Sequence, residues 1–206
     1  MSAAETSVRR TQSERRETAE RQIVLAAIEI IAEKGLSGLT LAAAGENAGY
    51  SRGIASHHFG KKDELLIAIV RHITERFSVQ VGEIQTVEPG LPMLLETIRQ
   101  YFDRVTKDSR GIRALHMVLS EGINNPSLAA PIAHANEKSI KGIAYHIHIG
   151  QDAGDLRPDL IPRQQAIIIL AGLRGVMAQW IIDPSDISLP DIREAFLNNV
   201  VRSLSV

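Results

Sequence analysis

The chain has 206 residues, of which 44% are apolar and 23% are charged, a composition typical of ordinary globular proteins with one or two domains. It contains no cysteine, which excludes disulfide bonds, thiolate nucleophiles and cysteine-based metal sites and indicates a reducing, cytoplasmic location. The net charge is −1, but residues 1–62 hold nine Lys and Arg against seven Asp and Glu, so the amino-terminal end is mildly basic.

Two features of the sequence argue against a membrane location. The first thirty residues carry Arg and Glu rather than an apolar stretch, so we expect no secretory signal. The most apolar stretch, residues 165–173, stops at Arg174 and is far shorter than the roughly 20 residues that cross a bilayer. We therefore expect no membrane-spanning segment.

The first predicted helix has signals at both of its ends. Thr11 and Glu14 have capping-box spacing, so this helix is expected to begin near Thr11 or Ser13. Gly35 follows the last apolar turn and is expected to end the helix. Residues 1–10 are small and polar and are predicted to be disordered.

Helical periodicity, rather than the alternation typical of strands, continues along the rest of the chain. Its breaks coincide with Gly and Pro clusters, such as residues 122–126 and 183–184. Ser188 precedes Pro190 in the pattern of a capped helix start. The predicted ranges are 41–48, 51–58, 61–81, 92–107, 110–122, 127–153, 163–182 and 189–204. The predicted fold class is therefore all-α.

The stretch GYSRG, residues 49–53, has two interpretations. Read as G-x-S-x-G, it matches the nucleophile elbow of serine hydrolases, with Ser51 as the nucleophile. That elbow needs a strand before the serine inside a parallel sheet, whereas the preceding TLAAAGENA is rich in alanine and has no strand character. The match of residues 49–53 to G-x-S-x-G is therefore better explained by chance.

The second interpretation is the turn of a helix-turn-helix. Thr40 can cap the helix over 41–48, and Gly49 supplies the left-handed conformation of a tight corner. Ser51 is then expected to cap the next helix, which places Arg52 on the opening turn of that helix. A recognition helix uses its opening turns to contact base edges in the major groove.

Residues 27–70 resemble the DNA-binding domain of the TetR (tetracycline repressor) family. The matching features are a helix ending in AEKG, Thr40, Ala48-Gly49, Ser51-Arg52-Gly53 and HHFGKKDEL. The later GQDAGDLRPDL and the helix with GLRGVMAQWIID are similar to the second half of many members. The resemblance implies a three-helix helix-turn-helix domain with an amino-terminal arm over residues 1–62, followed by a larger helical effector-binding and dimerisation domain over residues 63–206.

Arg52 is the leading candidate to read a base, because a guanidinium can bond O6 and N7 of guanine together; the alternative is a solvated surface arginine. Lys62 begins a helix, where its positive charge interacts unfavourably with the helix dipole. A phosphate close to Lys62 would explain a cation at this position. A basic arm can follow phosphates or remain a solvated tail, and it comprises Arg9, Arg10, Arg15 and Arg16. The expected DNA-binding residues are Thr40, Ser51, Arg52, Gly53, Ser56, His57, His58 and Lys62.

The sequence departs from the family pattern inside this motif. Ala44 and Gly45 replace a bulky aliphatic residue and an alanine, and a glycine within a helix costs about 0.5–1 kcal/mol relative to alanine. Ala55 and Ser56 replace a common leucine and a tyrosine that often meets the DNA backbone. These departures predict loose packing of the motif and an unusual pattern of base reading.

The second half is expected to bind an effector and to dimerise. Helices 163–182 and 189–204 are expected to form a four-helix dimer interface, the alternative being that both belong to the core of a monomer. No metal or cofactor is expected, because His134 and Glu137 lack the further ligands of a metal site. The expected effector-binding residues are Tyr101, Phe102, Met117, Ile143 and Trp180.

The resemblance implies a homodimeric, ligand-released repressor that binds a near-palindromic operator, and not an enzyme. Two alternatives remain open at this stage. One is an all-helical small-molecule binding or catalytic protein that no longer reads DNA, and the other is a purely structural helical dimer. Sequence-specific DNA binding separates the first prediction from both alternatives.

Overall fold

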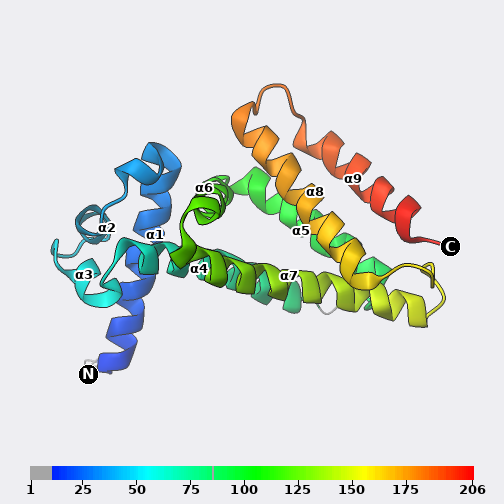
Figure 1. The fold of residues 1–206 in the computed structure, drawn as a ribbon, viewed down its shortest axis with the longest axis horizontal. Helices are drawn as coiled ribbons and strands as arrows, with labels where there is room; N and C mark the ends of the chain where they lie inside the picture. Colours follow the sequence, from blue (N-terminus) through cyan, green and yellow to red (C-terminus); the bar gives the residue numbers. More distant parts are fainter. Residues whose placement is uncertain (1–10, 85) are drawn as a thin grey trace, which may run out of the picture.

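The computed structural model describes residues 11–84 and 86–206, and helices account for nearly all of this part of the chain (Figure 1). Every predicted helix is present, although α3 begins three residues later than expected. The prediction for residues 1–10, including Arg9 and Arg10 of the basic arm, lies outside the described residues. The helices are α1 Gln12–Gly38, α2 Leu41–Asn47, α3 Ile54–Phe59, α4 Lys62–Gly82, α5 Leu91–Lys107, α6 Arg110–Asn124, α7 Pro126–Asp152, α8 Pro162–Ile182 and α9 Leu189–Leu204.

Helix α1 begins and ends where its sequence signals predict. The Thr11 hydroxyl accepts a hydrogen bond from the Glu14 backbone N–H at 3.2 Å, and the Glu14 carboxylate accepts one from the Thr11 N–H at 2.7 Å, which completes the capping box. At the other end Gly35 has φ 71°, and this left-handed residue interrupts the helical backbone within the assigned range.

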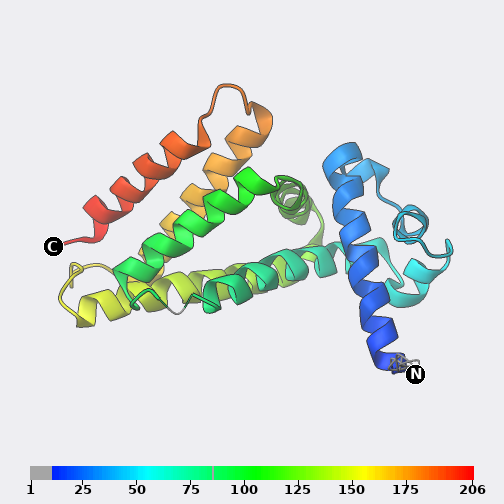
Figure 2. The ribbon, with the colours of Figure 1, turned by 180° about the vertical axis from the view of Figure 1, so that it is seen from behind.

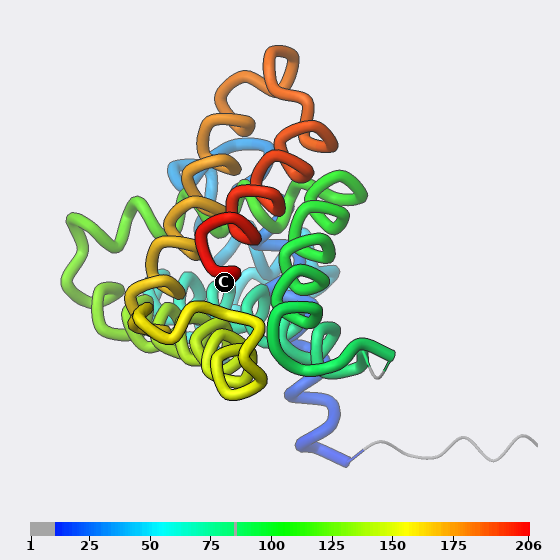
Figure 3. The backbone as a smooth tube through the Cα atoms, turned by 90° about the vertical axis from the view of Figure 1, so that its right-hand side faces the viewer, coloured from blue at the N-terminus to red at the C-terminus, as the bar shows by residue number. Residues whose placement is uncertain are grey.

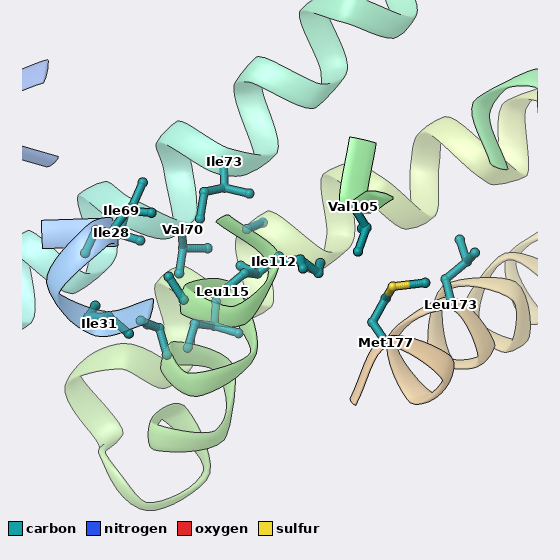
Figure 4. Packing of buried hydrophobic residues seen from close by; sticks show 14 of the residues in the cluster. Ile28, Ile31, Ile69, Val70, Ile73, Val105, Ile112, Leu115, Leu173 and Met177 are labelled. Carbon is teal, nitrogen blue, oxygen red and sulfur yellow. The ribbon is translucent and has the colours of Figure 1, made fainter. Parts of the chain in front are cut away.

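The helix-turn-helix unit α1–α3 lies at one end of the molecule, and α5, α7, α8 and α9 form the larger body (Figures 1 and 2). Helices α4 and α6 connect the two. Ile28 and Ile31 of α1 pack near Val70 of α4 and Leu115 of α6, so one continuous hydrophobic core runs through the junction (Figure 4). The expected domain boundary at 62/63 falls in the first turn of α4, which runs on without a break toward the larger body.

Helices α8 and α9 lie side by side along one edge of the larger body (Figure 3). Gly172 of α8 lies directly under the Phe196 ring of α9, since a Cβ on this glycine would sit 2.8 Å from the ring. One face of α8 is buried, through Ala166, Ile169, Leu173 and Met177.

The opposite face of α8 is apolar and exposed. Ile168 is 61% exposed and Ile182 is 84% exposed. The helix continues well past Arg174, so within residues 11–84 and 86–206 it alone has the length and composition of a membrane span, and only 22% of its most apolar window is buried in this chain. The uninterrupted apolar stretch stops at Arg174, as the sequence shows, but the apolar residues of the same helix resume beyond it.

Candidate nucleic-acid interface and ligand cavity

The corner between α2 and α3 is built from very small residues. Ala44 and Ala55 are completely buried, and a Cβ on Gly45 would lie 2.9 Å from the Ser51 carbonyl oxygen and 3.3 Å from Ile54 Cγ2. The Gly45 carbonyl also accepts a hydrogen bond from the Tyr50 N–H at 2.9 Å. The predicted loose packing is therefore wrong, because the missing side-chain volume is taken up by the close approach of the turn to α2.

Two of the turn signals are confirmed. The Thr40 hydroxyl accepts from the Ala43 N–H at 3.0 Å and caps α2, and Gly49 has φ 81°. The prediction that Ser51 caps the next helix is wrong. Helix α3 begins at Ile54 with Gly53 as its N-cap and no side-chain cap bond, while Ser51 contributes only its backbone carbonyl, which accepts from the Ile54 N–H at 3.1 Å.

The opening of α3 presents a narrow polar surface. Side chains on the opposite side of this helix pack inward, whereas the expected DNA-binding residues Ser51, Arg52, Gly53, Ser56 and His57 are all exposed. The Arg52 guanidinium donates to the Glu46 carboxylate of α2, and this partner raises the pKa of Arg52. Ion pairing therefore orients Arg52 across the turn while leaving it in solvent.

Two expected DNA-binding side chains are engaged inside the protein instead. The His58 ring is only 6% exposed and its Nδ1 lies 3.1 Å from the Glu20 carboxylate of α1. The Lys62 ammonium donates to the Leu36 carbonyl at 2.6 Å, near the carboxyl end of α1, where a cation is favoured by the helix dipole. This contact accounts for a lysine at the start of α4 without a nearby phosphate.

A cavity of about 350 Å³ lies within the larger body, among α4, α5, α6, α7 and α8. Its walls are largely aliphatic, with Val105 of α5 and Leu173 of α8 among the lining residues. Four ionisable groups other than histidine and tyrosine also line it, namely Arg104, Asp108, Lys138 and Arg174. A volume of this size accommodates a small organic molecule.

Two of the expected effector-binding residues, Tyr101 and Ile143, line this cavity. Phe102, Met117 and Trp180 do not. Phe102 follows Tyr101 by one residue, so it points about 100° further round α5 and packs against Phe196 of α9. Met117 and Trp180 are partly buried against the hydrophobic core outside the cavity wall.

The polar groups of the cavity were missed by reading for apolar and aromatic residues alone. Tyr101 and Arg104 share one face of α5 at helical spacing, and Asp108 is the residue that caps the carboxyl end of this helix; the i, i+3 spacing of the first two is the sequence signal that could have identified them. Burial raises the pKa of the Tyr101 hydroxyl, and burial lowers the pKa of both Arg104 and Arg174. The cavity therefore holds partly desolvated cations beside a protonated phenol.

Residues 23–69 match the family model described as bacterial regulatory proteins of the tetR family. The chain is similar to the HTH-type transcriptional regulator UidR of Escherichia coli K12, with 27% identity over 184 residues covering 89% of each protein. It is also similar to the HTH-type transcriptional regulator CymR of Pseudomonas putida, with 34% identity over 98 residues, which are 46% of this chain and 48% of CymR.

The fold matches that of solved regulators. SmeT, the repressor of the Stenotrophomonas maltophilia multidrug efflux pump SmeDEF, has a TM-score of 0.73 and 22% identity, with 91% of this chain and 90% of SmeT covered. SmeT has also been solved in complex with triclosan.

Proposed function

The chain belongs to the TetR family of bacterial regulatory proteins, and on this premise we propose that it is a homodimeric repressor released from a near-palindromic operator by a small molecule. Members of this family are DNA-binding transcriptional regulators and not enzymes. The observation that carries the proposal is the exposed opening of α3, where Arg52, Gly53, Ser56 and His57 face solvent at the tip of the molecule. A regulator of transcription works beside the chromosome, so we place it in the cytoplasm.

We propose that Arg52 reads a base and that Thr40, Ser51 and Ser56 contact the phosphate backbone of the DNA. The Thr40 hydroxyl uses its oxygen to cap α2 and keeps its hydrogen available for a phosphate. Gly53 has nothing within 4 Å of an added Cβ, so its lack of a side chain serves the approach to DNA rather than internal packing. His58 and Lys62 are left out of this surface, because both side chains have internal partners.

The exposed face of α8 supports the dimer. Ile168, Gly175 and Ile182 recur every seven residues and therefore form one stripe along the helix, and Ile161 precedes them by the same interval at the N-cap. The three isoleucines are 54%, 61% and 84% exposed, and a Cβ on Gly175 would meet open space. A second copy of α8 can cover this stripe, and the proposed twofold dimer would place its two copies of α3 in successive major grooves, about one turn of DNA apart or somewhat more.

Helix α9 is expected to share the dimer interface, but its apolar stripe of Ile192, Ala195, Phe196, Val200 and Leu204 is only partly available to a partner. Phe196 packs against Phe102 and Gly172 of the same chain, and Val200 and Leu204 are buried in its core. Ala195 is exposed and Ile192 is partly exposed, so the proposed α9 contribution to the dimer is smaller than that of α8.

Selection from random double-stranded DNA tests the proposal. The purified full-length protein is mixed with the DNA pool, and the retained fragments are sequenced. We expect an inverted repeat to be enriched, and we expect Arg52→Ala to lose the preference at one base pair of each half-site. Arg99→Ala is the matched control, because Arg99 is exposed on α5, far along the chain from the helix-turn-helix. Retention without any sequence preference would refute the proposal.

A further inference from the structure

The cavity in the larger body has more positive than negative groups in its wall. Arg104, Lys138 and Arg174 carry three positive charges, and Asp108 carries the single negative charge, which leaves a balance of +2 with histidine neutral. Asp108 is itself occupied, because its two carboxylate oxygens accept from the Nε and Nη2 atoms of Arg110 at 2.9 and 3.1 Å. The one carboxylate of the cavity wall is thus already paired with a cation.

Arg174 lacks an acidic partner within the described part of the chain. The only hydrogen bond that its guanidinium makes there is from Nη2 to the Asn136 side-chain oxygen at 2.8 Å. Burial lowers the pKa of this guanidinium, which means that its charge is partly stripped of solvent and incompletely compensated. A carboxylate is the group that best compensates a desolvated guanidinium, since the two form paired, charge-assisted hydrogen bonds.

Tyr101 supplies an independent observation in the same wall. Its hydroxyl oxygen is buried and has no hydrogen-bond partner among residues 11–84 and 86–206. The phenol and Arg174 lie close enough for each to influence the pKa of the other. A buried hydroxyl without a partner is rare in native proteins, and at a cavity wall it indicates a bond made to a ligand.

We propose that the cavity binds a small amphipathic anion, with its carboxylate between the Arg174 guanidinium and the Tyr101 hydroxyl and its apolar body among the aliphatic walls. This inference rests on the proposed function, because it names the chemical class of the molecule that would release the repressor. The aliphatic residues of the cavity wall come from all five helices around it, including Ile73 of α4, Ile112 of α6 and Ile143 of α7.

Two series of three probes test the proposal on the full-length protein. Octanoate, octylamine and octanol have an eight-carbon chain and differ in the head group, which is anionic, cationic or neutral. Phenylbutyrate, phenylbutylamine and phenylbutanol repeat the comparison with an aromatic body. Binding is measured by isothermal titration calorimetry at pH 7. We expect a carboxylate of at least one series to bind about tenfold or more tightly than its alcohol and its amine.

The variants assign that preference to the two residues. Arg174→Met keeps the length of the side chain, and we expect it to remove the preference for the carboxylate. Tyr101→Phe removes only the buried hydroxyl, so we expect it to weaken carboxylate binding by about three- to tenfold while the melting temperature of the free protein stays equal or rises. A merely structural tyrosine would give no loss of carboxylate binding. Arg99→Met is the matched control and should leave the preference unchanged.

The proposal is overturned if neither carboxylate binds more tightly than its alcohol, or if the preference survives both variants. The DNA selection described above is run on the same preparations. A protein that selects no DNA but binds carboxylates through Arg174 refutes the repressor and keeps the ligand class. A protein that selects an inverted repeat but binds amines or alcohols better refutes the ligand class alone.

Discussion

At the scale of single residues, the packing of α2 against α3 depends on Gly45. Two effects oppose each other when this glycine becomes alanine. Helix propensity favours alanine by about 0.5–1 kcal/mol, whereas overpacking costs about 1–3 kcal/mol. The new Cβ would lie 2.9 Å from the Ser51 carbonyl oxygen, which is backbone and cannot swing away. We expect Gly45→Ala to lower the free energy of unfolding by about 1 kcal/mol in urea titrations.

Gly53→Ala is the matched control for that prediction. Its φ of −82° suits alanine, and an added Cβ meets nothing within 4 Å, so its free energy of unfolding should stay within about 0.5 kcal/mol of the original. DNA affinity should nevertheless fall, because the methyl group would stand between α3 and the major groove. If both variants unfold at the same urea concentration as the original protein, the close approach of the turn to Gly45 does not exclude a side chain there, and the prediction is wrong.

A second residue-scale prediction concerns pH. Burial lowers the pKa of His146 below its ordinary value, so the unfolded chain binds a proton more readily than the folded one. The contribution of His146 to stability is therefore fully present above about pH 6.5, the ordinary pKa of histidine, and this contribution is lost as the pH falls below that value. Burial shifts the pKa of His72 in the same direction, so both residues contribute.

We expect the urea concentration at the unfolding midpoint of the original protein to decrease when the pH is lowered from 7.5 to 5.5. The decrease should be smaller in His146→Gln. His148→Gln is the control, since His148 lies two residues away with an exposed side chain that pairs with Asp152. Equal pH dependence in the original protein and His146→Gln would show that burial of His146 does not contribute.

Residue identity alone predicted the turn only in part. Thr40 and Gly49 have local roles, a cap and a left-handed corner, and both follow from residue type. Ser51 has the chemistry of a cap but lies three residues before the helix that it was expected to begin. The role of Gly45 depends on how closely the turn approaches α2, which is a tertiary contact that no local pattern contains.

At the scale of elements, Lys62 joins the start of α4 to the end of α1. The hydrogen bond from its ammonium to the Leu36 carbonyl predicts a structural role. We expect Lys62→Gln to lower the free energy of unfolding by about 1–2 kcal/mol, because a hydrogen bond from a charged group is lost. The dependence of DNA affinity on salt should stay the same, since no phosphate contact is removed.

The neighbouring Lys61→Gln is the matched control, because Lys61 is exposed and precedes α4. The free energy of unfolding should not change in this variant. A phosphate contact by Lys62 would give the opposite result, with unchanged stability and a salt slope reduced by about one. Unfolding and DNA titrations at several salt concentrations distinguish the two roles.

The helices themselves were predictable because their caps and breaks are local. Ser188 and Pro190 mark the start of α9, and the Ser188 hydroxyl accepts a hydrogen bond from the Asp191 N–H at 3.5 Å. The cavity was less predictable. Tyr101 and Phe102 are adjacent and chemically alike, yet only Tyr101 lines it, because the orientation of α5 against α4, α7 and α9 decides which face is enclosed.

At the scale of the whole molecule, coupling between the cavity and DNA requires a shared element. Helix α4 supplies it, because Ile73 and Phe77 line the cavity while Ile69 and Val70 pack into the junction with α1 (Figure 4). A ligand that shifts α4 therefore acts on the hydrophobic core that supports α1. For release, the ligand must bind more tightly to the arrangement whose α3 spacing does not match the operator.

The last prediction concerns the exposed stripe of α8. Ile168→Asp places a charge at the middle of the proposed dimer interface, where it would be buried without a partner, so the dimer should dissociate. Sedimentation velocity should then show the 22.6 kDa monomer instead of a species of twice that mass. Operator affinity should fall as well, because two half-sites are no longer held by one particle.

Ile123→Asp is the control, since Ile123 is 83% exposed at the carboxyl end of α6 and lies outside the stripe. It should remain dimeric and bind the operator as before. A dimer that survives Ile168→Asp would show that the dimer interface lies elsewhere. A monomeric original protein would show that the chain does not form a dimer interface at all. In either case the exposed stripe of α8 would need a different partner to cover it.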